Sequence, residues 1–332
     1  IGIPIPAVTY KIDPGQHVSH FAWMKILDAE HVHAVLQWPA LLETLHRAFA
    51  GAFTMPQRQV LRLDEDPASR DAFALLPAWN DEVIAVKAFT YFPGNEPPHP
   101  SLHSQILLFD RRHGQPLALI DGISVTMWRT SGISALAARL LARAEARTLM
   151  VLGTGQLAPF LIRAHAAVRP LERVLVWGRD PAKARALAGQ MAAELPGLAI
   201  EAVGSIEQGC AVADIIVSAT GSPDILVRGA WVRPGTHVDL LGNHHADHRE
   251  CDTDLVLRAD VYVDTFINCL KEAGEILIPL GEGVISRDFL RGELADLCAG
   301  RVPGRSNDSA ITLFKSVGAA LGDLATARMA FR

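Results

Sequence analysis

A short glycine-rich turn between an apolar strand and a helix constrains the fold of this chain more than any other feature. Gly153, Gly155 and Ala158 follow the pattern G-x-G-x-x-G/A. Residues 148–152 form an apolar run typical of a buried parallel strand, and residues 159–168 carry apolar side chains at helical spacing. Gly153 permits the tight turn, and Gly155 lets backbone N–H groups approach a pyrophosphate. The sequence therefore predicts a dinucleotide-binding unit; the alternative is a plain strand–helix turn.

Strands and helices alternate after this turn. Apolar runs predict five further strands, at residues 174–177, 199–203, 214–219, 237–241 and 261–264. Helices are expected over 181–195 and, as a connector before the unit, over the Ala- and Leu-rich residues 131–146. A last helix is expected over 311–329, where it could return to the first domain. The alternation predicts an α/β fold with a Rossmann-type, doubly wound parallel sheet.

The N-terminal third of the chain follows a different pattern. An amphipathic helix is expected over residues 40–50, directly after Pro39. Short runs broken by turn residues predict strands at 59–63, 72–76, 84–89, 105–109 and 116–120, with a hairpin loop at 110–114. Because consecutive strands of this kind usually pair antiparallel, the sequence predicts an α+β domain beside the α/β sheet.

Composition narrows the classes of partner. The 332 residues are 49% hydrophobic, enough for two domains with separate cores, and their formal net charge of −5 disfavours nucleic acid and anionic membranes as partners. No apolar stretch is long enough to span a bilayer. The four cysteines form no C-x-x-C pair, which indicates a reducing compartment and hence a cytoplasmic location. Residues 1–23, before Met24, lack periodicity and are interpreted as a leader or upstream extension.

The loop after the second expected strand of the dinucleotide unit bears on cofactor choice. An acidic residue there selects NAD, but this chain has Gly178 followed by Arg179, with Lys183 one helical turn later. Because arginine makes bidentate contacts with phosphate, the loop favours the 2′-phosphate of NADP(H). The alternative is that Arg179 is a solvated cation. Asp180 is expected to cap the helix beginning at Pro181, but it could also reach a ribose hydroxyl, so NAD(H) stays possible.

Several separated motifs carry a resemblance to a known family. They are residues 55–58 (MPQR), 86–87 with 92–95, 121–122 with 126–130, 153–156, 242 with 249–250, and 312–318. From Met24 to the C-terminus the chain resembles the ornithine cyclodeaminase/mu-crystallin family, and within it the cyclic ketimine reductases. The resemblance implies a homodimer with a substrate-binding and dimerisation domain over 24–128 with 305–332, and an NADP-binding Rossmann domain over 129–304. The active site would lie in the cleft between them.

The resemblance also implies a clamp of three cations for a substrate carboxylate, which falls on Arg58, Lys87 and Arg129. A small imino acid needs such fixed cations, and an ammonium near the reacting nitrogen can donate a proton, so Lys87 is also a candidate catalytic residue. Taken singly, each would more often be a surface cation. Arg129 and Thr130 are expected to open the connector helix, where their backbone N–H groups would meet the cofactor phosphates. The other expected cofactor contacts are Gly153, Thr154, Gly155, Gln156, Leu157, Gly178, Arg179, Asp180, Lys183, Thr220, Gly242 and Ser316.

The loop after the fifth expected strand departs from the cyclodeaminase pattern. That pattern is Gly-Gly-Asp-x-Pro-Gly-Lys-x-Glu-Leu, whereas His244 occupies the position of the Asp here. An imidazole offers no fixed negative charge to the ammonium of ornithine, so cyclodeaminase activity is disfavoured. His244 is instead a candidate lining residue and proton donor. With His245 and His248 it also suggests a metal site, but the spacing matches no recognised zinc motif, and no metal is expected.

These residues and the resemblance together imply NADPH-dependent reduction of cyclic imino acids by hydride transfer to the imine carbon. Pyrroline-2-carboxylate would give L-proline and piperideine-2-carboxylate would give L-pipecolate, within proline metabolism and lysine degradation. An amino-acid dehydrogenase of the alanine type and an ornithine cyclodeaminase remain as alternatives. A third alternative is a non-catalytic, NADPH-dependent ligand-binding protein of the mu-crystallin type.

Overall fold

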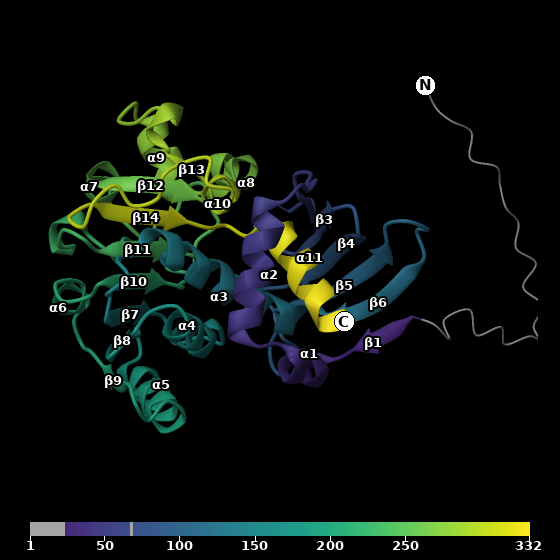
Figure 1. Ribbon diagram of the computed structural model, residues 1–332, viewed down its shortest axis with the longest axis horizontal. Coiled ribbons are helices and arrows are strands. Elements are labelled where there is room, and N and C mark those ends of the chain that lie inside the picture. The colour runs from purple at the N-terminus through teal and green to yellow at the C-terminus, as the bar shows by residue number, and fades with distance from the viewer. Residues whose placement is uncertain (1–23, 67–68) are drawn as a thin grey trace, which may run out of the picture.

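The chain folds around two β-sheets, and the structure, a computed structural model, describes residues 24–66 and 69–332 (Figure 1). The leader expected over residues 1–23 lies outside the described residues. The first sheet has six strands in the order β1-β6-β5-β4-β3-β2. Its strands are β1 (Lys25–Leu27), β2 (Gln59–Arg62), β3 (Ala72–Trp79), β4 (Val83–Tyr91), β5 (Leu102–Asp110) and β6 (Pro116–Asp121).

Strands β2 to β6 pair antiparallel in sequence order, as the sequence predicts. Two elements in this region are not among the predicted ones: strand β1, which pairs parallel with β6, and helix α1 (Ala29–Val35). Both are short, with three and seven residues, so neither shows a full hydrophobic period.

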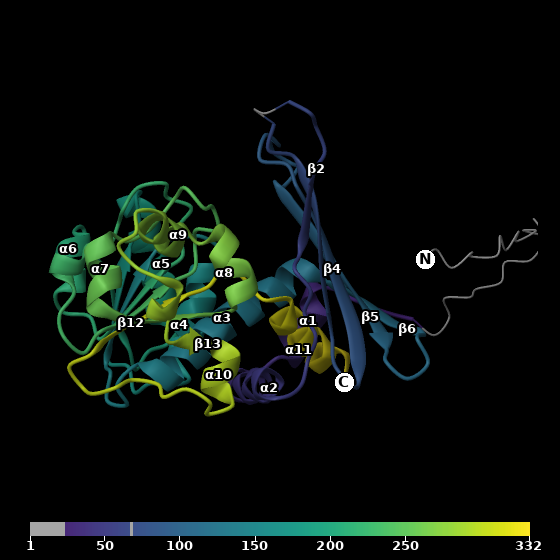
Figure 2. The ribbon, with the colours of Figure 1, turned by 90° about the horizontal axis from the view of Figure 1, so that it is seen from above.

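Helices cover one face of this sheet (Figure 2). Helices α3 (Gly122–Leu141) and α11 (Ala320–Phe331) pack on the strands, and α2 (Trp38–Ala50) packs on these two helices. Side chains on β3 alternate between buried and half-buried, as expected where a sheet packs on only one side. Leu76, Lys87, Ile106 and Ile120 are register neighbours across four strands on the buried side, so a lysine interrupts an otherwise apolar row.

The second sheet contains eight parallel strands in the order β13-β12-β14-β11-β10-β7-β8-β9. They are β7 (Thr148–Leu152), β8 (Arg173–Trp177), β9 (Ala199–Ala202), β10 (Ile215–Ser218), β11 (His237–Leu240), β12 (Ala259–Val263), β13 (Gly292–Glu293) and β14 (Ile311–Lys315). The order reverses between β7 and β10, the switch point at which doubly wound sheets bind ligands. This confirms the predicted α/β fold with its Rossmann-type sheet.

Helices lie between the parallel strands along the chain. They are α4 (Leu157–Ala166), α5 (Pro181–Glu194), α6 (Ile206–Cys210), α7 (Thr253–Arg258), α8 (Phe266–Glu272), α9 (Gly274–Gly281) and α10 (Leu294–Cys298). Helix α4 follows the glycine turn and α5 follows β8, so both predicted helices are confirmed within two residues at most of their expected starts.

The expected last helix over 311–329 is wrong in its first part. Ile311–Lys315 is strand β14, completely buried between β11 and β12, and the helix α11 begins only at Ala320. A short, uniformly apolar segment has no periodicity that separates a buried strand from a buried helix. Consequently β14 joins the second sheet, while α11 crosses back and packs against the first sheet and α2 (Figure 1).

The connector helix also begins earlier than its expected bounds of 131–146. The side chain of Asp121 caps α3 by accepting from Ser124 N, and the helix runs from Gly122 to Leu141. Arg129 and Thr130 are therefore interior residues whose backbone N–H groups belong to the helical hydrogen-bond ladder. The expectation that they open the helix and present these groups to phosphates is wrong. Any contact that they make with a cofactor has to use their side chains.

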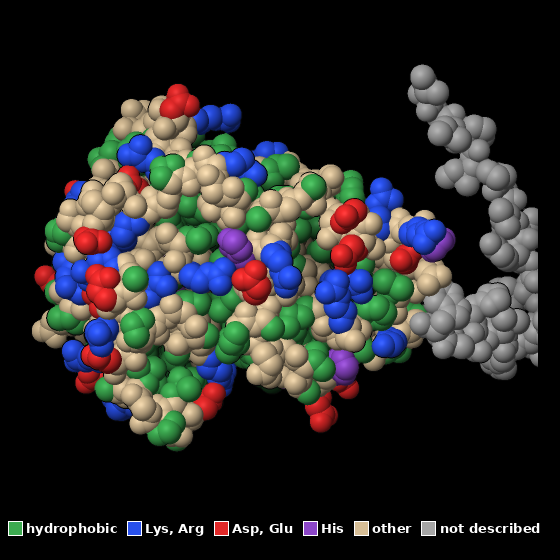
Figure 3. Space-filling model, in the orientation of Figure 1, with side chains coloured by type: hydrophobic (Ala, Val, Ile, Leu, Met, Phe, Trp, Pro, Cys, Tyr) green, Lys and Arg blue, Asp and Glu red, His purple; other side chains and the backbone are tan. Residues whose placement is uncertain are grey.

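The surface carries mixed charge. On the face shown in Figure 3, Lys and Arg side chains are interspersed with Asp and Glu. Among the residues that the structure describes, no helix combines the length and the apolar character that crossing a membrane requires.

Candidate active site

The glycine turn has the conformation that its sequence predicts. Gly153 has φ +116°, and a Cβ there would lie 2.8 Å from the backbone oxygen of Ala219, so only glycine fits. A Cβ on Gly155 would meet nothing within 4 Å, which leaves open space beside the turn. Thr154, Gln156 and Leu157 complete the turn, and Leu157 is the first residue of α4. These residues fit a pyrophosphate at a helix N-terminus.

The loop after β8 packs directly against this turn. A Cβ on Gly178 would lie 2.6 Å from Thr154 Cγ2, which explains the glycine at the first loop position. Asp180 caps α5 as expected, because its Oδ1 accepts from Ala182 N at 2.8 Å. Arg179 and Lys183 are exposed, and within the described chain their side chains have no ion pair or hydrogen bond. Both cations are therefore available for a phosphate.

Two other expected cofactor residues, Thr220 and Gly242, are joined by a buried carboxylate. Glu250 Oε1 accepts from the backbone N and Oγ1 of Thr220, and Oε2 accepts from Gly242 N at 2.9 Å. A Cβ on Gly242 would approach Thr220 O to 1.9 Å, so no side chain fits there. Ser316 lies just after β14 and donates to Asp264 at 2.8 Å. Glu250 is a residue whose organising role the sequence reasoning did not identify, although its motif was noted.

The structure brings the three predicted cations together. Arg58 lies just before β2, Lys87 on β4 and Arg129 on α3. A Cβ on Gly318 would lie 3.3 Å from Arg129 Nη1 and 3.6 Å from Arg58 Nη1, so both guanidinium groups converge on this glycine. Lys87 Nζ and Arg129 Nε lie 3.2 Å and 3.1 Å from the same atom, Oδ1 of Asp323. The cluster therefore spans the junction of both sheets.

Two carboxylates in this cluster were not predicted. Asp323 on α11 is 1% exposed and bridges Lys87 and Arg129. Glu272 at the end of α8 accepts from Arg58 Nε at 2.9 Å and also pairs with Arg58 Nη2. The available signal for Asp323 was a single acid within the alanine-rich C-terminal segment. An acid is rarely buried unless it is paired. No comparable signal marks Glu272, which lies among other polar residues.

Burial gives Lys87 an unusual acidity. Desolvation lowers the pKa of Lys87 to about 8, opposed by the carboxylate of Asp323 and assisted by Arg129 and Arg58. Its ammonium also donates to Thr126 Oγ1, one helical turn from Arg129. Lys87 is therefore mostly protonated at neutral pH, yet it releases a proton far more readily than an ordinary lysine.

His244, unlike Lys87, carries no charge at neutral pH. It is accessible to solvent, yet the protein around it displaces enough water to lower its pKa to about 4, helped by His245, Arg58 and Lys315. The imidazole is consequently uncharged at neutral pH. The rings of His244 and His245 stack with centroids 4.7 Å apart. Among the described residues, no group of three or more His, Cys, Asp or Glu side chains has the arrangement of a metal site.

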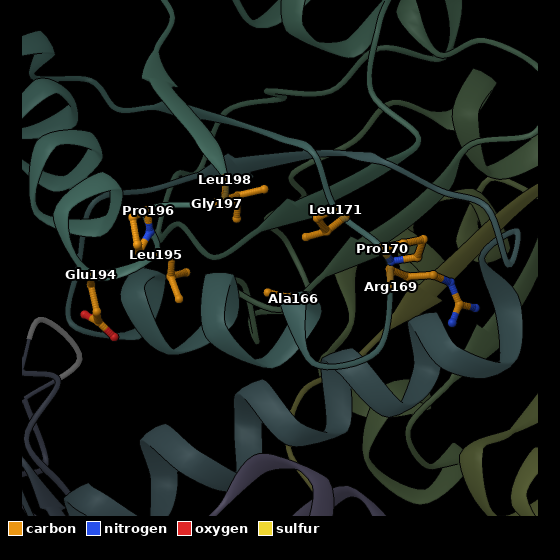
Figure 4. A pocket seen from close by; sticks show the side chains of 9 residues that line it. All are labelled: Ala166, Arg169, Pro170, Leu171, Glu194, Leu195, Pro196, Gly197 and Leu198. Carbon is orange, nitrogen blue, oxygen red and sulfur yellow. The ribbon is translucent and has the colours of Figure 1, made fainter.

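A shallow hollow in the second domain lies away from this cluster (Figure 4). It has a volume of about 390 Å³ and lies where α4 and α5 end, remote from the glycine turn at their beginnings. Arg169 in its wall donates to the carbonyl oxygens of Ala138 and Ala142 at the end of α3. Glu194 pairs with Arg163. These charges already have structural partners, so the hollow is not the candidate site.

The fold and the cation cluster define a class of two-domain α/β protein with a Rossmann-type sheet joined to an antiparallel sheet. The chain belongs to the ornithine cyclodeaminase/mu-crystallin family, whose model matches residues 24–331. It is 48% identical over 307 residues to a Δ1-pyrroline-2-carboxylate reductase of Colwellia psychrerythraea, covering 92% of this chain and 97% of that protein. The family resemblance read from the sequence is thereby confirmed.

Two solved structures are closely similar to most of the chain. The Δ1-pyrroline-2-carboxylate reductase of Thermococcus litoralis, in complex with NADH and L-proline, has a TM-score of 0.87 and 33% identity, covering 93% of this chain and 96% of that one. An archaeal alanine dehydrogenase dimer with bound NAD has a TM-score of 0.86 and 25% identity, covering 93% and 95%.

Proposed function

We propose that this chain is an NAD(P)H-dependent oxidoreductase that acts on the C=N bond of cyclic imino acids. Its substrates are pyrroline-2-carboxylate, reduced to L-proline, and piperideine-2-carboxylate, reduced to L-pipecolate. The observation that carries the proposal is the buried Lys87 ammonium, which shares Asp323 with Arg129 beside Arg58. The similarity to pyrroline-2-carboxylate reductases over nearly the full chain supports it.

The cations divide the chemical work between binding and proton transfer. Arg58 and Arg129 bind the substrate carboxylate, because guanidinium groups pair with carboxylates through two parallel hydrogen bonds. Lys87 donates a proton to the imine nitrogen, since its lowered pKa of about 8 suits a donor near neutral pH. Asp323 accepts from both Lys87 and Arg129 and so fixes the positions of the two cations relative to each other. Reduced nicotinamide, when bound, supplies the hydride for the imine carbon.

His244 is assigned to lining the site rather than to supplying its proton. With a pKa of about 4 it holds no dissociable positive charge at neutral pH, whereas Lys87 does. The absence of an acidic side chain at this position also leaves nothing there to bind the side-chain ammonium of ornithine. Reduction of an imine therefore suits this site better than cyclodeamination.

The preferred cofactor is NADP(H), with NAD(H) used less efficiently. Arg179 and Lys183 are free to bind a 2′-phosphate, and Asp180 Oδ1 is engaged in capping α5. The turn residues 153–157 hold the pyrophosphate through backbone N–H groups. Thr220, Gly242 and Ser316 lie at the ends of β10, β11 and β14, toward which the nicotinamide extends. The relative from Thermococcus litoralis is bound to NADH, and the assay below therefore compares both cofactors.

The protein acts as a homodimer through the uncovered face of the first sheet. Pro77, Val86, Leu107 and Leu119 are register neighbours on that face, half-buried in one chain and without a covering helix in the described part of it (Figure 2). An apolar face of this kind is typical of an association surface.

Residues 24–128 with α11 bind substrate and dimerise, and residues 129–304 with β14 hold the cofactor. A cytoplasmic location agrees with four free, buried cysteines.

One assay with purified protein tests the proposal. NADPH oxidation is followed with pyrroline-2-carboxylate and piperideine-2-carboxylate, then with NADH, then with pyruvate plus ammonia. Ornithine with NAD is the last arm. Rapid oxidation with the cyclic imines alone is the expected result. Faster reduction of pyruvate with ammonia would instead identify an amino-acid dehydrogenase, release of ammonia from ornithine a cyclodeaminase, and tight NADPH binding without turnover a ligand-binding protein.

A further inference from the structure

Arg58 forms an ion pair that joins the two sheets. Its Nε donates to Glu272 Oε1 at 2.9 Å, and its Nη2 pairs with Glu272 Oε2. Nη1 donates to the backbone oxygen of Val317, also at 2.9 Å. The side chains are only 12% and 22% exposed, so the pair is largely desolvated. Arg58 therefore meets a ligand while one carboxylate of its own chain is already bound.

The geometry of this pair leaves room for one more carboxylate. A guanidinium has five N–H donors, and the contacts with Glu272 and Val317 use three of them. One N–H remains on each terminal nitrogen, which is the number that a single bidentate carboxylate needs. A second carboxylate on the same ligand could bind Arg58 only by displacing Glu272 from Nε and Nη2.

The charges around the cluster also disfavour a second carboxylate on the ligand. Three cations, Arg58, Lys87 and Arg129, directly contact two carboxylates, Glu272 and Asp323, which leaves one positive charge. Behind the cluster, Asp264 adds a further negative charge, whereas Lys315 and Glu275 form an ion pair of zero net charge. Asp264 Oδ2 accepts from the backbone N of Val317 and Gly318, and Lys315 pairs with Glu275.

We propose that Glu272 is a specificity-determining residue that restricts this site to monocarboxylate imino acids. It holds Arg58 through Nε and Nη2, and its negative charge repels a second carboxylate on the ligand. This inference rests on the proposed function for the ligand class, cyclic imino acids. It adds the number of carboxylates that the ligand carries and the residue that enforces it.

The substitution Glu272→Gln separates charge from position. Glutamine keeps an Oε1 that accepts from Arg58 Nε, but it removes the negative charge. Glu194→Gln is a matched control, because Glu194 forms an equivalent two-contact pair with Arg163 at the surface, at 2.5 and 2.6 Å. Glu272→Asp keeps the charge, so it tests whether charge or side-chain length matters.

The readout is binding, which does not depend on turnover. Calorimetry measures pyrrole-2-carboxylate and pyrrole-2,5-dicarboxylate with each variant in the presence of saturating NADP+. We expect the unmodified protein to prefer the monocarboxylate by about tenfold or more, and Glu272→Gln to reduce this preference by about tenfold. Glu194→Gln and Glu272→Asp are expected to keep it.

Three results would overturn the proposal: an equal preference in Glu272→Gln and the unmodified protein, an equal change in Glu194→Gln, or no preference in the unmodified protein. NADPH oxidation with pyrroline-2-carboxylate is measured on the same samples. If the monocarboxylate binds selectively but no oxidation occurs, the proposed function fails while the role of Glu272 stands.

Discussion

The glycine turn and the cation cluster form their binding groups in different ways. The turn uses the backbone of consecutive residues, 153–157, placed between one strand and one helix. The cluster uses side chains from the segment before β2, from β4, α3 and α8, and from α11 near the end of the chain. A local conformation therefore holds the cofactor, whereas the substrate groups depend on the assembly of both sheets. The two regions should respond separately to substitution.

Removal of the Lys87 ammonium should have the largest effect on catalysis. Lys87→Ala deletes the proposed proton donor, so kcat for imine reduction is expected to fall by about 10²–10⁴-fold. NADPH binding, measured by fluorescence titration, is expected to stay within about twofold of the unmodified protein, because cofactor contacts lie on the other sheet. Arg58→Ala should likewise lose reduction and keep the cofactor. Loss of NADPH binding in either variant would contradict the separation of the two regions.

Substitutions in the turn should show the reverse pattern, with two distinct outcomes. Gly153→Ala places a side chain at φ +116° and against Ala219 O, so we expect destabilisation of about 1–3 kcal/mol in denaturant unfolding. Gly155→Ala meets nothing within 4 Å, so its stability should be unchanged. Its NADPH affinity is nevertheless expected to fall about tenfold, since the backbone approaches the pyrophosphate there. Normal NADPH affinity in Gly155→Ala would argue against cofactor binding at this turn.

Cofactor preference should be sensitive to Arg179. Arg179→Ala removes one charge-assisted contact with a 2′-phosphate and is expected to raise KM for NADPH about tenfold. KM for NADH should change little, which makes NADH the internal control. Arg185→Ala, on helix α5 just after this loop, serves as a matched substitution of an exposed arginine. If Arg179→Ala alters both cofactors equally, the loop does not read the 2′-phosphate.

The smallest expected effect is a shift in pH dependence. Lys87 donates only while protonated, so kcat/KM should hold below its pKa of about 8 and fall as the pH rises through it. The carboxylate of Asp323 raises the pKa of Lys87 against the effect of burial. Asp323→Asn removes this charge, so the alkaline limb of the kcat/KM profile should move to lower pH. His244→Gln should leave the limb in place. An unchanged limb in Asp323→Asn would show that Lys87 does not set it.

The difference between the local glycine turn and the cation cluster also explains which features can be predicted from the sequence. Turn residues, the capping by Asp180 and most strand positions depend on neighbours within one element, so local patterns suffice. Arg58, Lys87 and Arg129 were predicted through family motifs rather than through any local pattern. Their convergence at Gly318, and Asp323 and Glu272 as partners, depend on elements far apart in the chain.

The errors have a related physical origin. Ile311–Lys315 is a central strand that is buried on both faces, so its sequence shows no alternation of apolar and polar residues. Its strand structure depends on pairing with β11 and β12, which the local sequence does not reveal. Helix α3 was expected to start too late because Asp121, whose side chain caps it, also ends strand β6. Where one residue ends an element and caps the next, propensity alone does not place the boundary.

The most direct test is a crystal structure of the protein with NADP+ and L-proline. The account predicts the proline carboxylate on Arg58 and Arg129, the ring nitrogen within hydrogen-bond reach of Lys87 Nζ, and the pyrophosphate on the turn at Gly153 and Gly155. A proline carboxylate bound away from both arginines, or a ring nitrogen facing His244 with Lys87 uninvolved, would contradict it.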